Sequence, residues 1–137
     1  MTQPAQASFP ELSRVQKGRY PFRLACPSFI YPADYLPNVR KLGAYLDEIE
    51  LLFLEGRQRQ HLPDAQLIRE LKTLAGAMDV SYNVHLFTDI SLCAHSEQER
   101  KQAVDHTACL LSLVEPLDPS ACVLHLEWQG GSRKEFV

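Results

Sequence analysis

The stretch that decides the fold is Ser81-Tyr-Asn-Val-His-Leu-Phe-Thr-Asp89, which has a later counterpart in Cys122-Val-Leu-His-Leu-Glu127. Each stretch is a short strand-like run with one histidine near its C-terminal end. Between them lies a polar, helix-forming segment of the length that a crossover between two parallel strands requires. Because such strands end at the same edge of a sheet, the sequence predicts that His85 and His125 face a common site.

A unit of one strand followed by one helix repeats along the whole chain. Strands are predicted at 22–26, 48–54, 80–86 and 121–126, and helices at 35–45, 64–78 and 96–114. Asp64 is the expected N-cap of the second helix, and Ser96 with Glu99 has the spacing of a capping box at the start of the third. The run 48–54 is mostly apolar, which is typical of a parallel strand covered on both faces.

This alternation predicts the α/β class, with parallel (β/α) repeats. Neither a Gly-x-Gly-x-x-Gly fingerprint after the first strand nor a phosphate-binding P-loop is present, which disfavours a dinucleotide site. A whole TIM (β/α)8 barrel takes about 250 residues. About four strands in 137 residues therefore predict the N-terminal half of such a barrel. Its unpaired edges and uncovered inner face favour a homo-oligomer that completes the barrel, or a further part of the barrel.

Composition and charge indicate how the chain is organised and which classes of protein are disfavoured. The expected organisation is a flexible arm at 1–18, a partial barrel domain at 19–128 and a polar tail at 129–137. A net charge of −3 gives no basic footprint for nucleic acid. No run approaches the roughly 18 apolar residues of a membrane span, and residues 1–17 lack the apolar core of a signal peptide. The four cysteines form no Cys-x-x-Cys pair, so a cytoplasmic protein with reduced thiols is expected.

The strand ends supply the candidate site residues. Neutral imidazoles are common ligands of zinc, manganese and iron, so His85 and His125 are the candidate metal ligands; the alternative is two core histidines bonded to backbone. Asp89, in the loop beyond His85, is expected to bind substrate or metal, to orient a histidine, or only to shape a turn. Glu55 ends the second strand and is expected at the substrate rim, and Glu127 is a rim carboxylate or a further ligand.

The remaining polar residues are assigned more ordinary roles. Glu50 lies inside an apolar strand, so it is expected to face the barrel interior or to pair with Arg23. The other histidines, His61, His95 and His106, are expected at the surface. A Gly-x-Ser-x-Gly elbow is absent, so a Ser-His-Asp triad has no support. The sequence singles out no catalytic base or nucleophile.

At these residues the chain resembles the xylose-isomerase-like TIM-barrel superfamily, which includes the apurinic-endonuclease type and the sugar phosphate isomerases and epimerases. Val-His-Leu at 84–86 and Leu-His-Leu at 124–126 match the histidines of its third and fourth strands. A narrower resemblance is to the cobamide-remodelling phosphodiesterases. It is carried by Tyr-Pro-Phe-Arg-Leu (20–24), Ile-Tyr-Pro-Ala-Asp-Tyr-Leu-Pro-Asn-Val-Arg (30–40), Asp-Glu-Ile-Glu-Leu (47–51) and the stretch from Pro-Leu-Asp-Pro to Val-Leu-His-Leu (116–126).

The narrower resemblance implies a metal-dependent enzyme that hydrolyses the phosphodiester in the nucleotide loop of a cobamide. His85 and His125 then carry over as ligands of a divalent ion, with zinc or manganese expected, while the family's other ligands come from later strands. The partner is a cobamide or another phosphorylated small molecule. Two alternatives stay open: a sugar phosphate isomerase or epimerase of the same superfamily, and a non-catalytic half-barrel that self-associates or is completed by a partner.

Overall fold

A computed structural model describes residues 11–58 and 61–126 of the chain. Its helices and strands alternate, as the sequence predicts, and all four strands form one parallel sheet in the order β1-β2-β3-β4. The strands are β1 (Ala25–Pro27), β2 (Glu48–Leu52), β3 (Ser81–His85) and β4 (Cys122–Val123). The helices are α1 (Tyr35–Leu42), α2 (Ala65–Met78), α3 (Glu97–Val114) and the short 3-10 helix η2 (Glu115–Leu117).

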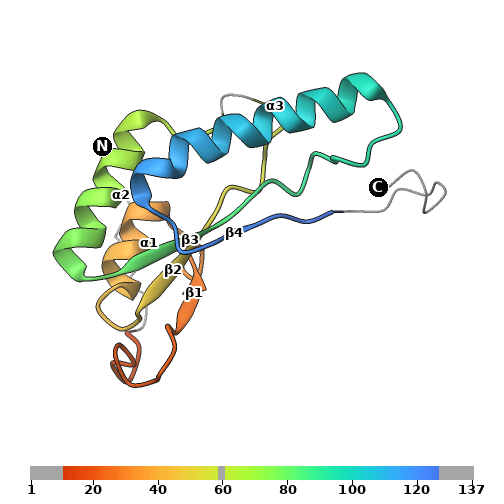
Figure 1. The fold of residues 1–137 in the computed structure, drawn as a ribbon. Coiled ribbons are helices and arrows are strands. Elements are labelled where there is room, and N and C mark those ends of the chain that lie inside the picture. Colours follow the sequence, from red (N-terminus) through yellow and green to blue (C-terminus); the bar gives the residue numbers. More distant parts are fainter. Residues whose placement is uncertain (1–10, 59–60, 127–137) are drawn as a thin grey trace.

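The sequential strand order explains why the sheet has two unlike faces. Parallel crossovers are right-handed, so a chain that always steps in the same direction places its helices on the same face. Figure 1 shows α1, α2 and α3 on one side of the strands. On that side Ile49, Leu51, Tyr82 and Val84 are almost fully buried in the core.

The opposite side of the sheet, which we call the open face, carries mainly polar side chains. It is formed by residues that alternate with the core positions, in register across the strands: Glu48, Glu50, Leu52, Ser81, Asn83, His85 and Val123, continued by His125. The prediction that the second strand is covered on both faces is wrong for the described residues, because Glu50 and Leu52 are only half-buried. Because the sequential strand order places the helices on the other side, no helix covers this face, and polar side chains are expected there.

Helix caps follow the sequence closely because they are local interactions. The Asp64 side chain accepts a hydrogen bond from the Leu67 N–H at 2.7 Å, and Ser96 accepts one from the Glu99 N–H at 3.4 Å. Both predicted N-caps are therefore confirmed. None of the helices among the described residues is long and apolar enough to cross a membrane.

The first strand begins later than the predicted 22–26. The carboxylate of Asp47 accepts the Leu24 N–H at 3.0 Å and the Gly18 N–H at 2.7 Å, so a side chain takes the place of a strand partner there. The ladder starts only at Ala25, which pairs with Glu48. The same interactions hold the end of the predicted N-terminal arm against the sheet, while residues 1–10 and the predicted tail lie outside the described residues.

Candidate functional site

The two predicted strand-end histidines meet on the open face. His85 is the last residue of β3 and lies in register with Leu52 and Val123, and His125 follows Val123 by two residues. The Nε2 atoms of His85 and His125 are 3.0 Å apart, with ring centroids 4.8 Å apart and planes tilted by 31°. The carboxyl ends of parallel strands are where α/β sheets bind ligands. The pair therefore lies at the edge where a functional site is expected.

The tautomer of His85 follows from its other ring nitrogen. Nδ1 lies 2.9 Å from the backbone oxygen of Leu86, and a carbonyl oxygen only accepts, so Nδ1 carries the proton. In the neutral ring Nε2 is then bare and presents its lone pair to His125. An Nδ1–H bonded to a carbonyl is the usual orientation of a histidine that binds metal through Nε2.

The spacing of the two nitrogens fits a shared divalent ion. Imidazole nitrogens bind zinc at about 2.0–2.1 Å, so two of them on one ion at tetrahedral or octahedral angles lie about 2.9–3.4 Å apart. The observed 3.0 Å falls in this range. Two ligands are fewer than a zinc site uses, and no group of three metal-binding side chains occurs in ranges 11–58 and 61–126. Glu127, the nearest predicted further ligand, lies outside the described residues.

Asp89 is bound to the backbone of the neighbouring loop and does not join the histidine pair. Its Oδ1 accepts the Gly56 N–H at 2.6 Å and its Oδ2 accepts the Arg57 N–H at 3.1 Å. In return the Arg57 Nε–H donates to the Asp89 backbone oxygen at 2.6 Å. The carboxylate thus shapes the loop after β2, and its predicted contact with substrate stays a prediction.

Glu55 lies in the loop after β2, three residues beyond the end of that strand. Its carboxylate is 2.8 Å from Nδ1 of His61, and the two side chains are 67% and 35% exposed. The predicted surface position of His61 is therefore confirmed. Because the Glu55 side chain is open to solvent, it is free to reach a ligand at the rim, and that role also stays a prediction.

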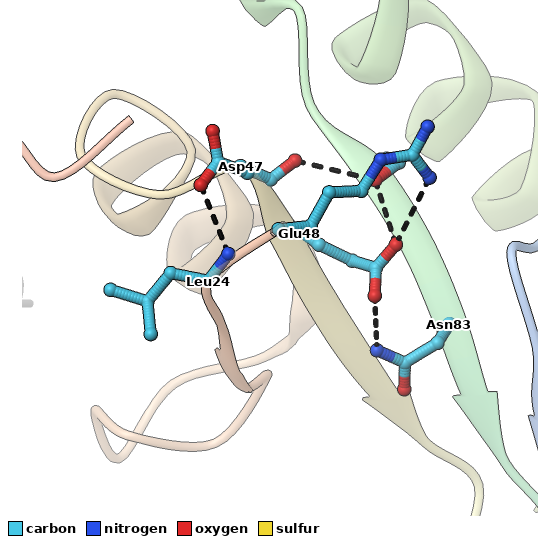
Figure 2. Close-up of polar contacts among 6 residues, drawn as sticks. Leu24, Asp47, Glu48 and Asn83 are labelled. Atoms are coloured by element: carbon cyan, nitrogen blue, oxygen red, sulfur yellow. Dashed lines mark hydrogen bonds and ion pairs between the residues drawn. The ribbon is translucent and has the colours of Figure 1, made fainter. Parts of the chain in front are cut away.

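The buried carboxylate of the open face is Glu48, not Glu50. Glu48 accepts hydrogen bonds from Ser81 Oγ and Asn83 Nδ2, both at 2.8 Å, and Arg23 Nη1 lies 3.5 Å from its carboxylate. Figure 2 shows this carboxylate turned toward Asn83 on the next strand. Of the two expectations for Glu50, the pairing with Arg23 is wrong, because Arg23 contacts Glu48 instead. Glu50 lies on the open face, in register with Asn83.

Hydrogen bonding holds Glu48 in its charged form. Burial is the largest single effect and by itself raises the pKa of the carboxyl. Donors from Ser120, Asn83 and Ser81, with the charge of Arg23, outweigh it, so the pKa of Glu48 lies below its ordinary value of 4.5. Sequence reasoning missed this group because only the register distinguishes it from Glu50.

His106 is not the surface residue that the sequence predicts. It is half-buried, and its Nδ1 donates to the Gly56 backbone oxygen at 2.7 Å. Its position on α3 gives no hint of this bond, because the partner comes from a loop fifty residues earlier in the chain. His95, by contrast, is exposed as predicted.

The loop after β1 is fixed by a residue inside α1. The fully buried Asn38 accepts the Tyr31 N–H through Oδ1 at 2.9 Å. Its Nδ2 donates to the backbone oxygens of Tyr31, Ala33 and Asp34 at 2.8 to 3.1 Å. One amide side chain therefore holds the loop at the same edge of the sheet as the histidine pair.

Comparison with known proteins adds no relative: no protein-family model, curated protein or solved structure matches the chain.

Proposed function

We propose that this chain carries part of the active site of a metal-dependent phosphodiesterase that acts on a cobamide or a related phosphorylated small molecule. The observation that carries the proposal is the contact of His85 with His125 at 3.0 Å, at the carboxyl edge of a parallel sheet. The sequence resemblance supplies the substrate class. The geometry supports the ligand role, since both imidazoles present Nε2 to the same point.

Each residue has a defined part in this proposal. His85 is held by its Nδ1–H bond to Leu86 and offers Nε2. His125 offers Nε2 from the neighbouring strand and would hold the ion through that nitrogen, with its ring proton on Nδ1. A bound divalent cation supplies Lewis-acid chemistry, which polarises a phosphoryl oxygen and activates water. Glu55, whose exposed carboxylate pairs with His61, contacts the substrate in this proposal.

We propose further that the sheet is one half of a (β/α)8 barrel and that the open face is its interior. The sequential order β1-β2-β3-β4 and the helices on one side support this, because a barrel is wound in the same way. Apolar side chains beside both outer strands also support it. Phe22 next to β1 is 60% exposed and Leu126 beyond β4 is 54% exposed, as expected for edges that further strands cover.

The test is hydrolysis by the full-length protein loaded with zinc or manganese. A cobamide, a generic phosphodiester such as bis(p-nitrophenyl) phosphate, and a sugar phosphate are supplied in parallel. We expect release of cobinamide from the cobamide, and a loss of at least a hundredfold in rate for His125→Gln, with His95→Gln, at an exposed histidine outside the proposed site, as the matched control. Undiminished hydrolysis by His125→Gln contradicts the ligand role, and isomerisation of the sugar phosphate without phosphodiester cleavage contradicts the reaction.

A further inference from the structure

A cavity lies beyond the carboxyl ends of β2 and β3, between α3 and the loops that follow these strands. Its volume is about 470 Å3, within the range of small-molecule sites. It is bounded by α3 and by the loop between β3 and α3, which runs alongside the helix (Figure 1). The polar residues that line it are Arg57, Thr88, Asp89, Ser91, Glu99, Gln102 and His106. None of them belongs to the open face that carries the histidine pair.

Hydrogen bonds to the backbone of Gly56 and Arg57 hold one wall of this cavity. Asp89 binds the Gly56 and Arg57 N–H groups, and His106 binds the Gly56 backbone oxygen. A side chain at Gly56 would overlap the ring of Phe87, which is itself buried. Three separate segments, the loops after β2 and β3 and the helix α3, are thus joined at one point. The cavity is preformed rather than a gap between loose loops.

The groups that α3 contributes are hydrogen-bond acceptors. Glu99, Gln102 and His106 follow one another at helical spacing, so they form one stripe along the cavity. Because Nδ1 of His106 donates to Gly56, Nε2 of the neutral ring carries a lone pair and accepts. The Glu99 carboxylate is exposed and accepts, and the Gln102 amide both accepts and donates.

The charges in the cavity disfavour an anion as its natural ligand. Two carboxylates, Asp89 and Glu99, face one guanidinium, Arg57. Asp89 already accepts two backbone N–H groups, and Arg57 Nε is bonded to a backbone oxygen. What remains is a surplus of acceptors with one cationic donor. A ligand with several hydroxyl groups meets this set, since each hydroxyl both donates and accepts.

We propose that this cavity is a binding site for a neutral polyhydroxylated small molecule, a sugar or polyol, separate from the histidine pair. Hydroxyl groups donate to Glu99 and to Nε2 of His106, and accept from Gln102 and Arg57. The buried methyl groups of Ala94 and Ala103 form the apolar floor against which a sugar ring packs. The site does not depend on the proposed phosphodiesterase activity.

The experiment is saturation-transfer and chemical-shift NMR on the full chain, with D-ribose and myo-inositol as probes. Inorganic phosphate tests for an anion site and ethylamine for a cation site. We expect saturation transfer to a polyol and shifts of the Ala94 and Ala103 methyl signals. Shifts confined to the ring signals of His85 and His125 would place the ligand at the other site and overturn the proposal. Preferential binding of phosphate or ethylamine would overturn the ligand class.

The matched variants are Glu99→Gln and Glu97→Gln, two exposed glutamates in the first turns of α3, of which only Glu99 lines the cavity. Loss of a hydrogen bond to a charged group weakens binding about tenfold or more. We expect this loss for Glu99→Gln, a smaller loss of about two- to tenfold for Gln102→Leu, whose amide is uncharged, and unchanged affinity for Glu97→Gln. Both cavity positions are exposed, so we expect the variants to keep the fold. Equal weakening by Glu97→Gln, or no polyol binding to the unaltered chain, refutes the site.

Discussion

The Glu48 network gives the sharpest test of how the open face is held. Replacing Glu48 with Gln removes the charge while keeping the shape of the side chain. The carboxylate accepts hydrogen bonds from Ser81 and Asn83, each at 2.8 Å, and such bonds to a charged group contribute about 1.5–3 kcal/mol each. The Gln side chain keeps one oxygen that can accept from Ser81 or Asn83. Its amide NH2 group then faces the other of these two donors. We expect a loss of about 2–3 kcal/mol in the free energy of unfolding at pH 7.

Arg23 contributes little to that figure. Its side chain is 62% exposed and lies 3.5 Å from the carboxylate, so solvent screens the pair. The variant Arg23→Gln is therefore expected to lose less than about 1 kcal/mol. Urea denaturation followed by circular dichroism measures both variants.

The pH dependence of this difference has a definite sign. The pKa of Glu48 is lower in the folded chain than its ordinary value of 4.5. The folded state therefore gains stability from the charged carboxylate above pH 4.5 and loses it as the pH falls through the lower, folded-state pKa. The stability difference between the unaltered chain and Glu48→Gln is expected to be constant near neutral pH and to shrink in acid.

A matched control is Glu50→Gln, two residues away on the same face. Within the described residues, no hydrogen bond or ion pair is recorded for the Glu50 side chain, which is half-buried. Its replacement is expected to change the free energy of unfolding by less than about 0.5 kcal/mol. The reasoning is refuted if Glu50→Gln costs as much as Glu48→Gln, or if the Glu48→Gln deficit stays the same down to pH 3.

Three further predictions concern the rest of the fold. Gly56→Ala places a methyl group against the buried Phe87 ring and is expected to lower the free energy of unfolding by about 1–3 kcal/mol. Gly76→Ala has open space around it inside α2 and is expected to raise the free energy of unfolding by about 0.5–1 kcal/mol. Thermal unfolding compares the two variants. Asn38→Ala frees the loop after β1 and should lose about 2–4 kcal/mol in urea unfolding, and a loss below 1 kcal/mol contradicts its role as a clamp. Exposed sheet edges predict self-association of the isolated chain in light scattering after size exclusion, and a monodisperse monomer at high concentration contradicts it.

Local features of the fold are readable from the sequence because the atoms that decide them are close along the chain. Asp64 and Ser96 cap helices within their own first turn, and α3 ends at Val114, two residues before Pro116, where the sequence predicts its end. The start of β1 is not readable in this way. It depends on the carboxylate of Asp47, more than twenty residues away, which takes the Leu24 N–H from the ladder.

The same distinction between local patterns and long-range contacts applies to the candidate site. The meeting of His85 and His125 follows from strand parity and parallel order, both of which the sequence pattern indicates. The partners of Asp89 and His106 do not, because both bind Gly56 only after the loop after β2 folds back against the third unit. Glu48 needs the register itself: Glu48 and Glu50 lie on the same face, and only the pairing of Glu48 with Ser81 brings its carboxylate within reach of Ser81 and Asn83.

The most direct test of the account is titration of the chain with Zn2+ or Mn2+ by isothermal calorimetry, comparing the unaltered protein with His85→Gln, His125→Gln and His61→Gln. We predict a bound ion whose affinity falls at least tenfold in each of the first two variants. His61, which pairs with Glu55 away from the histidine pair, should leave the affinity unchanged. Equal affinity in all four proteins, or no binding to the unaltered chain, contradicts the claim that His85 and His125 share a metal ion.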